Sequence, residues 1–203
     1  VTAVNQMLKI PLNPIQLYPY ALAGETAASG EAHGDNVGPA LLGGLTVSVG
    51  GDEPRVVQVP VPNQLRCVLV HPRLRIETRD SRGILPDAFD RRDVVQQMSL
   101  LSGFITGCFQ RDLDLIEASL ADLLVEPVRS PHVPGFGAVK AAALECGAMG
   151  CSLSGSGPSV FAWFRSEATA RTGADAMREA FAAAGHESEC YVSSVNSPGA
   201  RQA

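Results

Sequence analysis

Polar residues that could take part in binding or catalysis form four separated groups along the chain. The groups are Glu25 with residues 33–36, residues 82–86, residues 126–129 and residues 154–159. Each group alone has an ordinary structural explanation: an exposed carboxylate, a loop histidine, a solvated arginine or a tight glycine turn. Whether these groups form a functional site therefore depends on the elements that position them.

The group at 154–159 is predicted to form the turn of a β-hairpin. An alternating run at 151–153 precedes it and an apolar run at 160–164 follows it. Gly155 and Gly157 can adopt positive φ without a steric penalty, which suits a tight turn. Such a loop could bring bare backbone close to a ligand, although a turn that simply needs glycine explains the same spacing. The hydroxyl groups that it could present belong to Ser154, Ser156 and Ser159.

Glu25 is predicted to lie near the end of a helix. Asn13 and Pro14 are a favourable N-cap and first helical residue, and the helix is expected to end near Ser29-Gly30. Pro19 conflicts with an unbroken helix, so the helix either kinks there or begins there. A carboxylate near the C-terminal end of a helix gains nothing from the helix dipole. Glu25 is therefore expected either to face solvent or to have a cation as its partner.

Residues 30–39 are predicted to form a polar, glycine-rich loop. His33, Asp35 and Asn36 all fall within it, which is more polar chemistry than a connector needs. Loops held by a rigid scaffold are where binding groups concentrate. This loop is therefore a candidate binding segment.

The remaining pattern predicts two groups of elements joined near residues 61–63. The first contains a helix at 1–8 ended by Pro11, the helix and loop already described, and strands at 45–49 and 56–61. The second contains strands at 67–71, 151–153, 160–164 and 189–195, and helices at 89–107, 112–125, 136–146 and 167–184. Strand, helices, two strands, helix and strand is the order of a split βαβ, ferredoxin-like domain. Residues 75–85 are expected to form a basic loop or short helix, and residues 196–203 a loose tail.

The composition is that of a globular protein and excludes several classes of partner. Of 203 residues, 45% are hydrophobic and 18% charged, the net charge is −5, and the lysines are Lys9 and Lys140 alone. No basic face for nucleic acid is indicated. The five cysteines include no C-x-x-C pair, so reduced thiols are expected rather than a zinc site or disulfides. The sequence also contains no signal peptide and no membrane-spanning run, which predicts a cytoplasmic protein without a membrane partner.

Jointly, in their order and spacing, the four groups resemble the homoserine kinase family of the GHMP small-molecule kinases. Glu25 followed by Ala-Ser-Gly, the run His33-Gly34-Asp35-Asn36-Val37-Gly38-Pro39-Ala40, and Gly43-Gly44 are similar to one conserved block of that family. Residues 82–86, and residues 126–129 with 134–136, resemble two further segments. Residues 148–164 are similar to the third GHMP motif, and residues 196–201 to the family's C-terminal segment. The resemblance covers essentially the whole chain.

The resemblance implies an α+β, GHMP kinase-like fold of two domains. Residues 1–62 would be the C-terminal remainder of a ribosomal S5-like, ATP-binding N-terminal domain. Residues 63–203 would be the ferredoxin-like C-terminal domain.

The resemblance also implies an activity: ATP-dependent phosphorylation of the L-homoserine hydroxyl to O-phospho-L-homoserine, a step towards threonine. ATP and Mg²⁺ would be the cofactors, L-homoserine the small-molecule partner, and a homodimer the assembly. Glu25 would be catalytic as the Mg²⁺ ligand, together with Asn36. The substrate-binding residues would be His33, Asp35, Arg82, Arg129, Gly155, Ser156 and Gly157.

The chain departs from the family in one respect. It contains no Gly-Leu-Gly-Ser-Ser phosphate loop, so the residues that bind the nucleotide are unknown and we expect an N-terminal portion of the kinase to be missing. The incomplete first sheet would then leave an edge and an apolar face exposed. Two alternatives stay open: another GHMP kinase, such as a mevalonate or sugar kinase, or a non-catalytic amino-acid-binding or dimerisation module.

Overall fold

The computed structural model describes residues 1–51, 53–74 and 84–201, which fall into two units. Unit 1 comprises Val1–Val61 and Val195–Ala203, and unit 2 comprises Pro62–Ser194. The chain passes from one unit to the other at the joint that Val61-Pro62-Asn63 suggests. The assignment of residues 1–62 and 63–203 to the two family domains stays a prediction.

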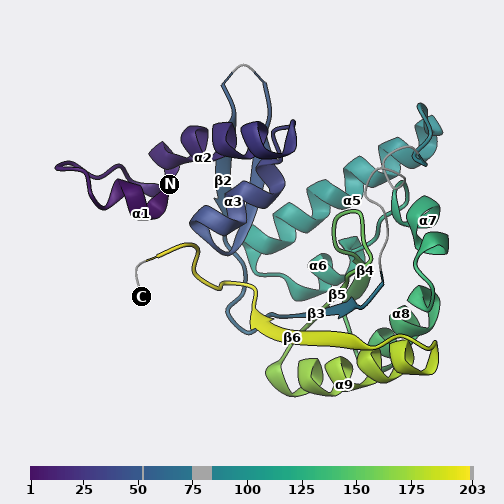
Figure 1. The fold of residues 1–203 in the computed structure, drawn as a ribbon. Helices are drawn as coiled ribbons and strands as arrows, with labels where there is room; N and C mark the ends of the chain where they lie inside the picture. The colour runs from purple at the N-terminus through teal and green to yellow at the C-terminus, as the bar shows by residue number, and fades with distance from the viewer. Residues whose placement is uncertain (52, 75–83, 202–203) are drawn as a thin grey trace. The chain divides into compact units, whose positions relative to one another are not determined.

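Unit 2 is built on a four-stranded antiparallel sheet (Figure 1). Its strands are β3 (Arg66–Pro72), β4 (Gly150–Leu153), β5 (Val160–Phe164) and β6 (Ser188–Ser194). They lie in the order β4-β5-β3-β6, and every neighbouring pair is antiparallel. This order is that of a ferredoxin-like sheet, so the predicted α+β architecture is confirmed for this unit.

One face of this sheet forms the core with two helices, α8 (Phe136–Glu145) and α9 (Glu167–Ala183). Alternate residues point to that face, among them Val68, Val160 and Phe164, none of which is exposed. Burying a side chain of this size stabilises the fold by about 1.5–3 kcal/mol. Gly173 of α9 lies against the Phe164 ring, and a Cβ at this position would collide with the ring.

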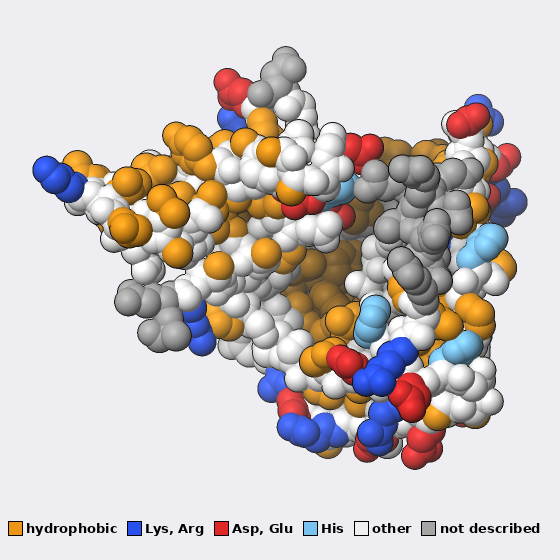
Figure 2. Space-filling view, in the orientation of Figure 1, with side chains coloured by type: hydrophobic (Ala, Val, Ile, Leu, Met, Phe, Trp, Pro, Cys, Tyr) orange, Lys and Arg blue, Asp and Glu red, His pale blue; other side chains and the backbone are white. Residues whose placement is uncertain are grey.

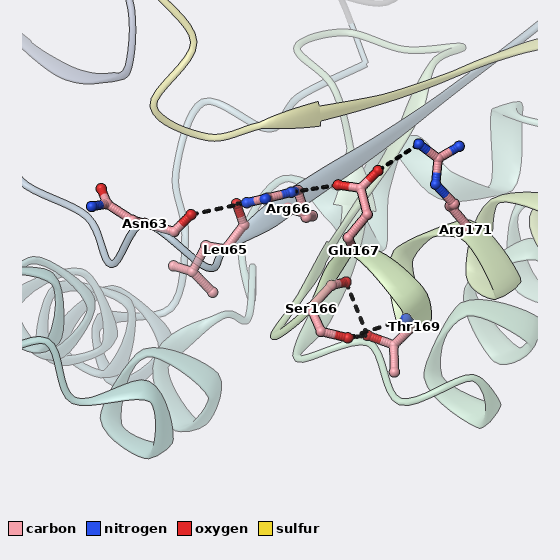
Figure 3. Close-up of polar contacts among 7 residues, drawn as sticks. All are labelled: Asn63, Leu65, Arg66, Ser166, Glu167, Thr169 and Arg171. Carbon is pink, nitrogen blue, oxygen red and sulfur yellow. Dashed lines mark hydrogen bonds and ion pairs between the residues drawn. The ribbon is translucent and has the colours of Figure 1, made fainter.

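The start of α9 is tied to β3 by side chains (Figure 3). Ser166 is the N-cap and accepts a hydrogen bond from the backbone N–H of Thr169. Glu167 accepts from Nε of Arg66 at 2.6 Å and also pairs with Arg171 at 2.7 Å. The N-terminal end of α9 is therefore anchored both by its own cap and by the sheet it covers.

Between β3 and α8, the described residues form three further helices and a 3₁₀ turn. They are α5 (Arg91–Gln110), α6 (Leu113–Ser119), α7 (Glu126–Arg129) and η1 (Ser130–His132). The single helix predicted over 112–125 is wrong, since α6 ends at Ser119. The carboxylate of Asp122 accepts from the backbone N–H groups of Leu124, Val125 and Glu126. This turn competes with the helix and leads into α7.

Unit 1 contains three helices and one antiparallel hairpin among its described residues. They are α1 (Thr2–Asn5), α2 (Pro14–Ser29), α3 (Gly34–Leu42), β1 (Leu45–Val49) and β2 (Arg55–Val59). Asn13 and Gln16 form a capping box at the start of α2, and Gly30 ends that helix at φ +84°. The helix continues through Pro19, so the alternative that it begins there is wrong.

Two other expectations for unit 1 are corrected. The helix predicted over 1–8 is limited to α1, because the Asn5 side chain exchanges two hydrogen bonds with the Leu12 backbone and closes a turn. The segment predicted as a loop over 30–39 is helical from Gly34 onward. Gly34 packs against the hydrogen-bonded hydroxyl groups of Tyr18 and Ser48, where a Cβ would collide with both. Glycine here serves close packing rather than a flexible loop.

The loose tail predicted over residues 196–203 is not observed for the described residues 196–201. The backbone of Gly44 donates to Ser197 at 2.9 Å, and that of Ala200 donates to Ala40 at 2.9 Å. The side chain of Asn196 donates to the Val61 carbonyl at 3.1 Å. Residues 196–201 therefore pack onto unit 1.

Apolar side chains are exposed along α1, α2 and the segment between them, as Figure 2 shows. They include Val4, Met7, Ile10, Ile15 and Tyr20. The expected exposure of an edge and an apolar face of the first sheet stays a prediction. In the described part of the chain, no helix combines the length and apolar content that a bilayer crossing needs.

The five cysteines are free thiols, as expected. Burial raises the pKa of Cys67 and Cys108 to about 11 and that of Cys151 to about 12. These three thiols are therefore protonated at neutral pH and poorly reactive.

Candidate active site

The structure brings Glu25 and His33 together in unit 1. Glu25 lies on the last turns of α2, and His33 is the N-cap residue of α3. The left-handed Gly30 ends α2, and the chain then returns so that Nδ1 of His33 lies 2.8 Å from Oε1 of Glu25. The side chains of His33 and Glu25 are 22% and 31% exposed, respectively, so both are partly accessible to solvent.

The surroundings of this pair favour an ionised Glu25. The hydroxyl of Ser29 lies 3.2 Å from Nδ1 of His33, and Oε2 of Glu31 lies 3.5 Å from Nε2. Hydrogen bonds, first from His33 and then from Ser29, lower the pKa of Glu25 below its ordinary value. The cation partner that the position of Glu25 suggested is therefore His33 when that ring is protonated.

We expect His33→Ala to raise the pKa of Glu25 towards its ordinary value of 4.5. The lowered pKa contributes stability above the unfolded-state pKa, and this contribution is lost as the pH falls through the folded-state value. The variant should therefore lose less stability on acidification than the parent chain. Carboxyl ¹³C resonances, titrated in both chains with His186→Ala as the control, measure this. An unchanged Glu25 titration would contradict the role of His33.

Asp35 and Asn36 lie in the first turn of α3 and are exposed. Neither makes a side-chain hydrogen bond to another residue that the structure describes. A carboxylate is favoured at this end of a helix by the dipole, which gives Asp35 a structural role without any ligand. The substrate and catalytic roles of these two residues stay predictions.

In unit 2 the structure brings Arg129 to the glycine loop. Arg129 is the last residue of α7, and its Nη1 donates to the carbonyl of Gly155 at 3.2 Å. Gly155 and Gly157 have φ of +59° and +81°, as the predicted turn requires. Within the loop, the backbone of Ser154 donates to Ser159 at 2.8 Å, and that of Gly157 donates to Ser154 at 3.0 Å. The predicted hairpin between β4 and β5 is confirmed.

The guanidinium of Arg129 has capacity for an anion. Its side chain is half-buried, and Nε is shielded from solvent without a hydrogen-bond partner. No carboxylate of the described residues lies within ion-pair distance of it. A guanidinium with unused N–H groups and restricted hydration is suited to a carboxylate ligand.

Two interactions near this loop involve residues that the sequence did not single out. Lys140 of α8 forms an ion pair with Glu126, the first residue of α7. His71 of β3 forms a hydrogen bond with Ser159 at the end of the loop. The contact between His71 and Ser159 could be expected only from the pairing of β3 with β5, because continuing that register places residue 71 opposite residue 159.

Arg82, the other predicted arginine, lies outside the described residues. Among those described, no cluster of three or more side chains could enclose a metal ion. Mg²⁺ does not need such a cluster, because it is commonly held by one or two carboxylates together with phosphate oxygens and water. An ionised and partly exposed Glu25 fits that requirement.

Comparisons with known proteins find one matching family model and similarity to homoserine kinases. Residues 104–183 match the family described as GHMP kinases C terminal. The chain is 46% identical over 199 residues to a homoserine kinase of Xylella fastidiosa and 43% identical over 201 residues to one of Xanthomonas campestris, covering 98% and 99% of this chain. A crystal structure of homoserine kinase from Cytophaga hutchinsonii matches 97% of the chain with a TM-score of 0.93 and 42% identity. The chain spans 61–62% of the length of these proteins.

Proposed function

We propose that this chain serves the ATP-dependent phosphorylation of L-homoserine, because it is a partial homologue of homoserine kinases and its residues 104–183 match the GHMP kinases C terminal family. The product would be O-phospho-L-homoserine. The observation that carries this proposal is 46% identity with a homoserine kinase over 98% of the chain. Another GHMP kinase is the alternative, and nothing in the comparisons supports it better.

Arg129 is proposed to bind the substrate carboxylate. L-Homoserine carries a carboxylate, an ammonium group and the hydroxyl that receives the phosphoryl group. The half-buried guanidinium has no acidic partner among the described residues, which supports this assignment. Its fork of N–H groups can hold a carboxylate through two parallel hydrogen bonds. Arg82, by the resemblance, would bind the same group.

Glu25 is proposed to hold Mg²⁺. Phosphoryl transfer depends on positioning and on neutralising phosphate charge, and the metal ion supplies that neutralisation when bound. The hydrogen bond from His33 keeps the Glu25 carboxylate ionised and fixes its orientation. No residue of this chain is assigned to the nucleotide, because the sequence contains no phosphate loop.

The remaining predicted residues have supporting roles in the proposal. His33 and Asp35 would contact the substrate, and Asn36 would assist catalysis from the exposed start of α3. Gly155, Ser156 and Gly157 would present backbone groups to the substrate. The free cysteines are consistent with the cytoplasm as the compartment, and a homodimer stays part of the proposal.

Calorimetric titration of L-homoserine into the 203-residue chain tests the proposal directly. We expect saturable binding with one site per chain. Mevalonate, which has a carboxylate and a hydroxyl but no ammonium group, should bind more weakly, and L-threonine tests discrimination among hydroxy amino acids. Preference for mevalonate, or no binding of homoserine by a sample shown to be folded, would contradict the assignment of the substrate site to these residues.

A further inference from the structure

His71 holds the second end of the glycine loop. Its Nδ1 lies 2.8 Å from Oγ of Ser159, the residue that directly precedes β5. The register of β3 with β5 pairs Val70 with Val160, so His71 and Ser159 are opposite one another on the same sheet face. The contact thus joins the last residues of one strand to the point where the loop enters the next.

The loop has few other constraints. Its two internal hydrogen bonds are backbone contacts, and Arg129 is the other side chain that bonds to it among the described residues. Arg129 forms its hydrogen bond with the loop at Gly155, whereas His71 forms its hydrogen bond four residues later, at Ser159. Because Gly155 and Gly157 both have positive φ, the side-chain contacts at the two ends limit the directions that the intervening backbone can take.

The other neighbours of His71 leave its ring available for Ser159. Glu189 lies opposite His71 on β6, but its carboxylate accepts from the Tyr191 hydroxyl at 2.7 Å and lies 3.7 Å from Arg73. No ion pair between His71 and Glu189 is found among the described residues. Among the described residues, Ser159 is therefore the hydrogen-bond partner of this ring, and Glu189 interacts with it only through charge.

We propose that His71 is a positioning residue: by fixing Ser159, it sets the direction in which the backbone of Gly155–Gly157 is presented to the substrate. The inference rests on the proposed function for the identity of that substrate. It adds a residue outside the four groups identified from the sequence. His71 itself need not touch the substrate.

Four variants separate positioning from a general structural role. His71→Ala and Ser159→Ala each remove the hydrogen bond from one side, and the double variant removes both partners. His71→Asn places an amide atom close to the position of Nδ1 and should keep the bond. His186→Ala makes the same change elsewhere in unit 2 and serves as the control.

The first measurement is amide hydrogen exchange at Ser154 and Gly157, whose N–H groups donate within the loop. We expect the exchange rate of these two amides to rise roughly fivefold in His71→Ala and in Ser159→Ala. This is the change in local opening that follows from the loss of one ordinary hydrogen bond. The double variant should be no faster than either single variant, and His71→Asn should be close to the parent chain. Unchanged exchange, or equal acceleration throughout unit 2, would overturn the inference.

The second measurement is the affinity for L-homoserine by calorimetry. The dissociation constant should rise roughly fivefold in His71→Ala and return in His71→Asn. Faster loop exchange with unchanged affinity would overturn the link to substrate. If the folded parent chain binds no homoserine, the proposed substrate site fails and so does the link to substrate, and the exchange measurement decides whether His71 holds the loop.

Discussion

Arg129→Ala should weaken the binding of L-homoserine by roughly 30- to 700-fold, equivalent to about 2–4 kcal/mol. The size of this effect follows from the site. The guanidinium is half-buried and has no acidic partner among the described residues, so the bound carboxylate would lose its charged partner without recovering full hydration. Calorimetric titration of the parent and variant chains measures it directly.

Removal of Arg129 also removes the hydrogen bond to Gly155, so the two causes must be separated. L-Homoserinol, which replaces the carboxylate with a hydroxymethyl group, provides the separation. If Arg129 binds the carboxylate, the parent and variant should bind homoserinol with similar, weak affinity. If the loop contact alone matters, the variant should lose affinity for both ligands.

Two further substitutions sharpen this prediction. Arg129→Lys keeps the charge but loses the planar fork, so its affinity should be intermediate. Arg171→Ala removes an arginine that is 71% exposed and paired with Glu167 on α9, and it should leave homoserine binding unchanged. Equal affinity of the parent chain and Arg129→Ala for homoserine would contradict the assignment.

Local sequence signals predicted the elements of this fold well where one signal dominated. Asn13, Pro14 and Gly30 defined both ends of α2, and Gly155 with Gly157 defined the hairpin turn. The helix predicted over 112–125 failed because its apolar period continues past the point where Asp122 turns the chain. Periodicity reports which residues can be buried together, but it does not report where a side chain competes for the backbone.

The sequence predicted the candidate site only in part, because some of its contacts depend on how distant segments pair and pack. Glu25 and His33 lie eight residues apart, and their proximity follows from one turn between two helices. The bond between His71 and Ser159 joins residues 88 positions apart and depends on the register of β3 with β5. In the loop predicted over 30–39, glycine and asparagine disfavour a helix, yet packing of Gly34 against Tyr18 and Ser48 outweighs that preference.

Lys140→Met should lower the free energy of unfolding of unit 2 by about 2–3 kcal/mol. The Glu126 side chain is only 12% exposed, and its Oε2 already has no hydrogen-bond partner. Loss of Lys140 would therefore leave a nearly buried carboxylate without its cation. Because the Lys140 side chain is 32% exposed, we expect the loss of unfolding free energy to be smaller than that for a fully buried pair, which is about 3–5 kcal/mol.

Trp163 provides the measurement, since it is the single tryptophan of the chain and lies buried in β5. Urea unfolding followed by its fluorescence reports on unit 2. Lys9→Met, which changes the other lysine at an exposed position in unit 1, should leave this transition unchanged. Glu126→Gln combined with Lys140→Met should recover much of the loss, because a neutral amide replaces the stranded charge. A double variant as unstable as Lys140→Met would contradict the ion pair as the cause.

The ion pair and the Arg129 contact lie at opposite ends of α7. A helix of four residues is not stable by itself, so α7 depends on contacts at its ends. The ion pair fixes the N-terminal end at Glu126, and the Arg129 side chain reaches Gly155 from the C-terminal end. The two ends should therefore respond differently to substitution. Lys140→Met should change the unfolding free energy far more than the homoserine affinity, whereas Arg129→Ala should do the reverse.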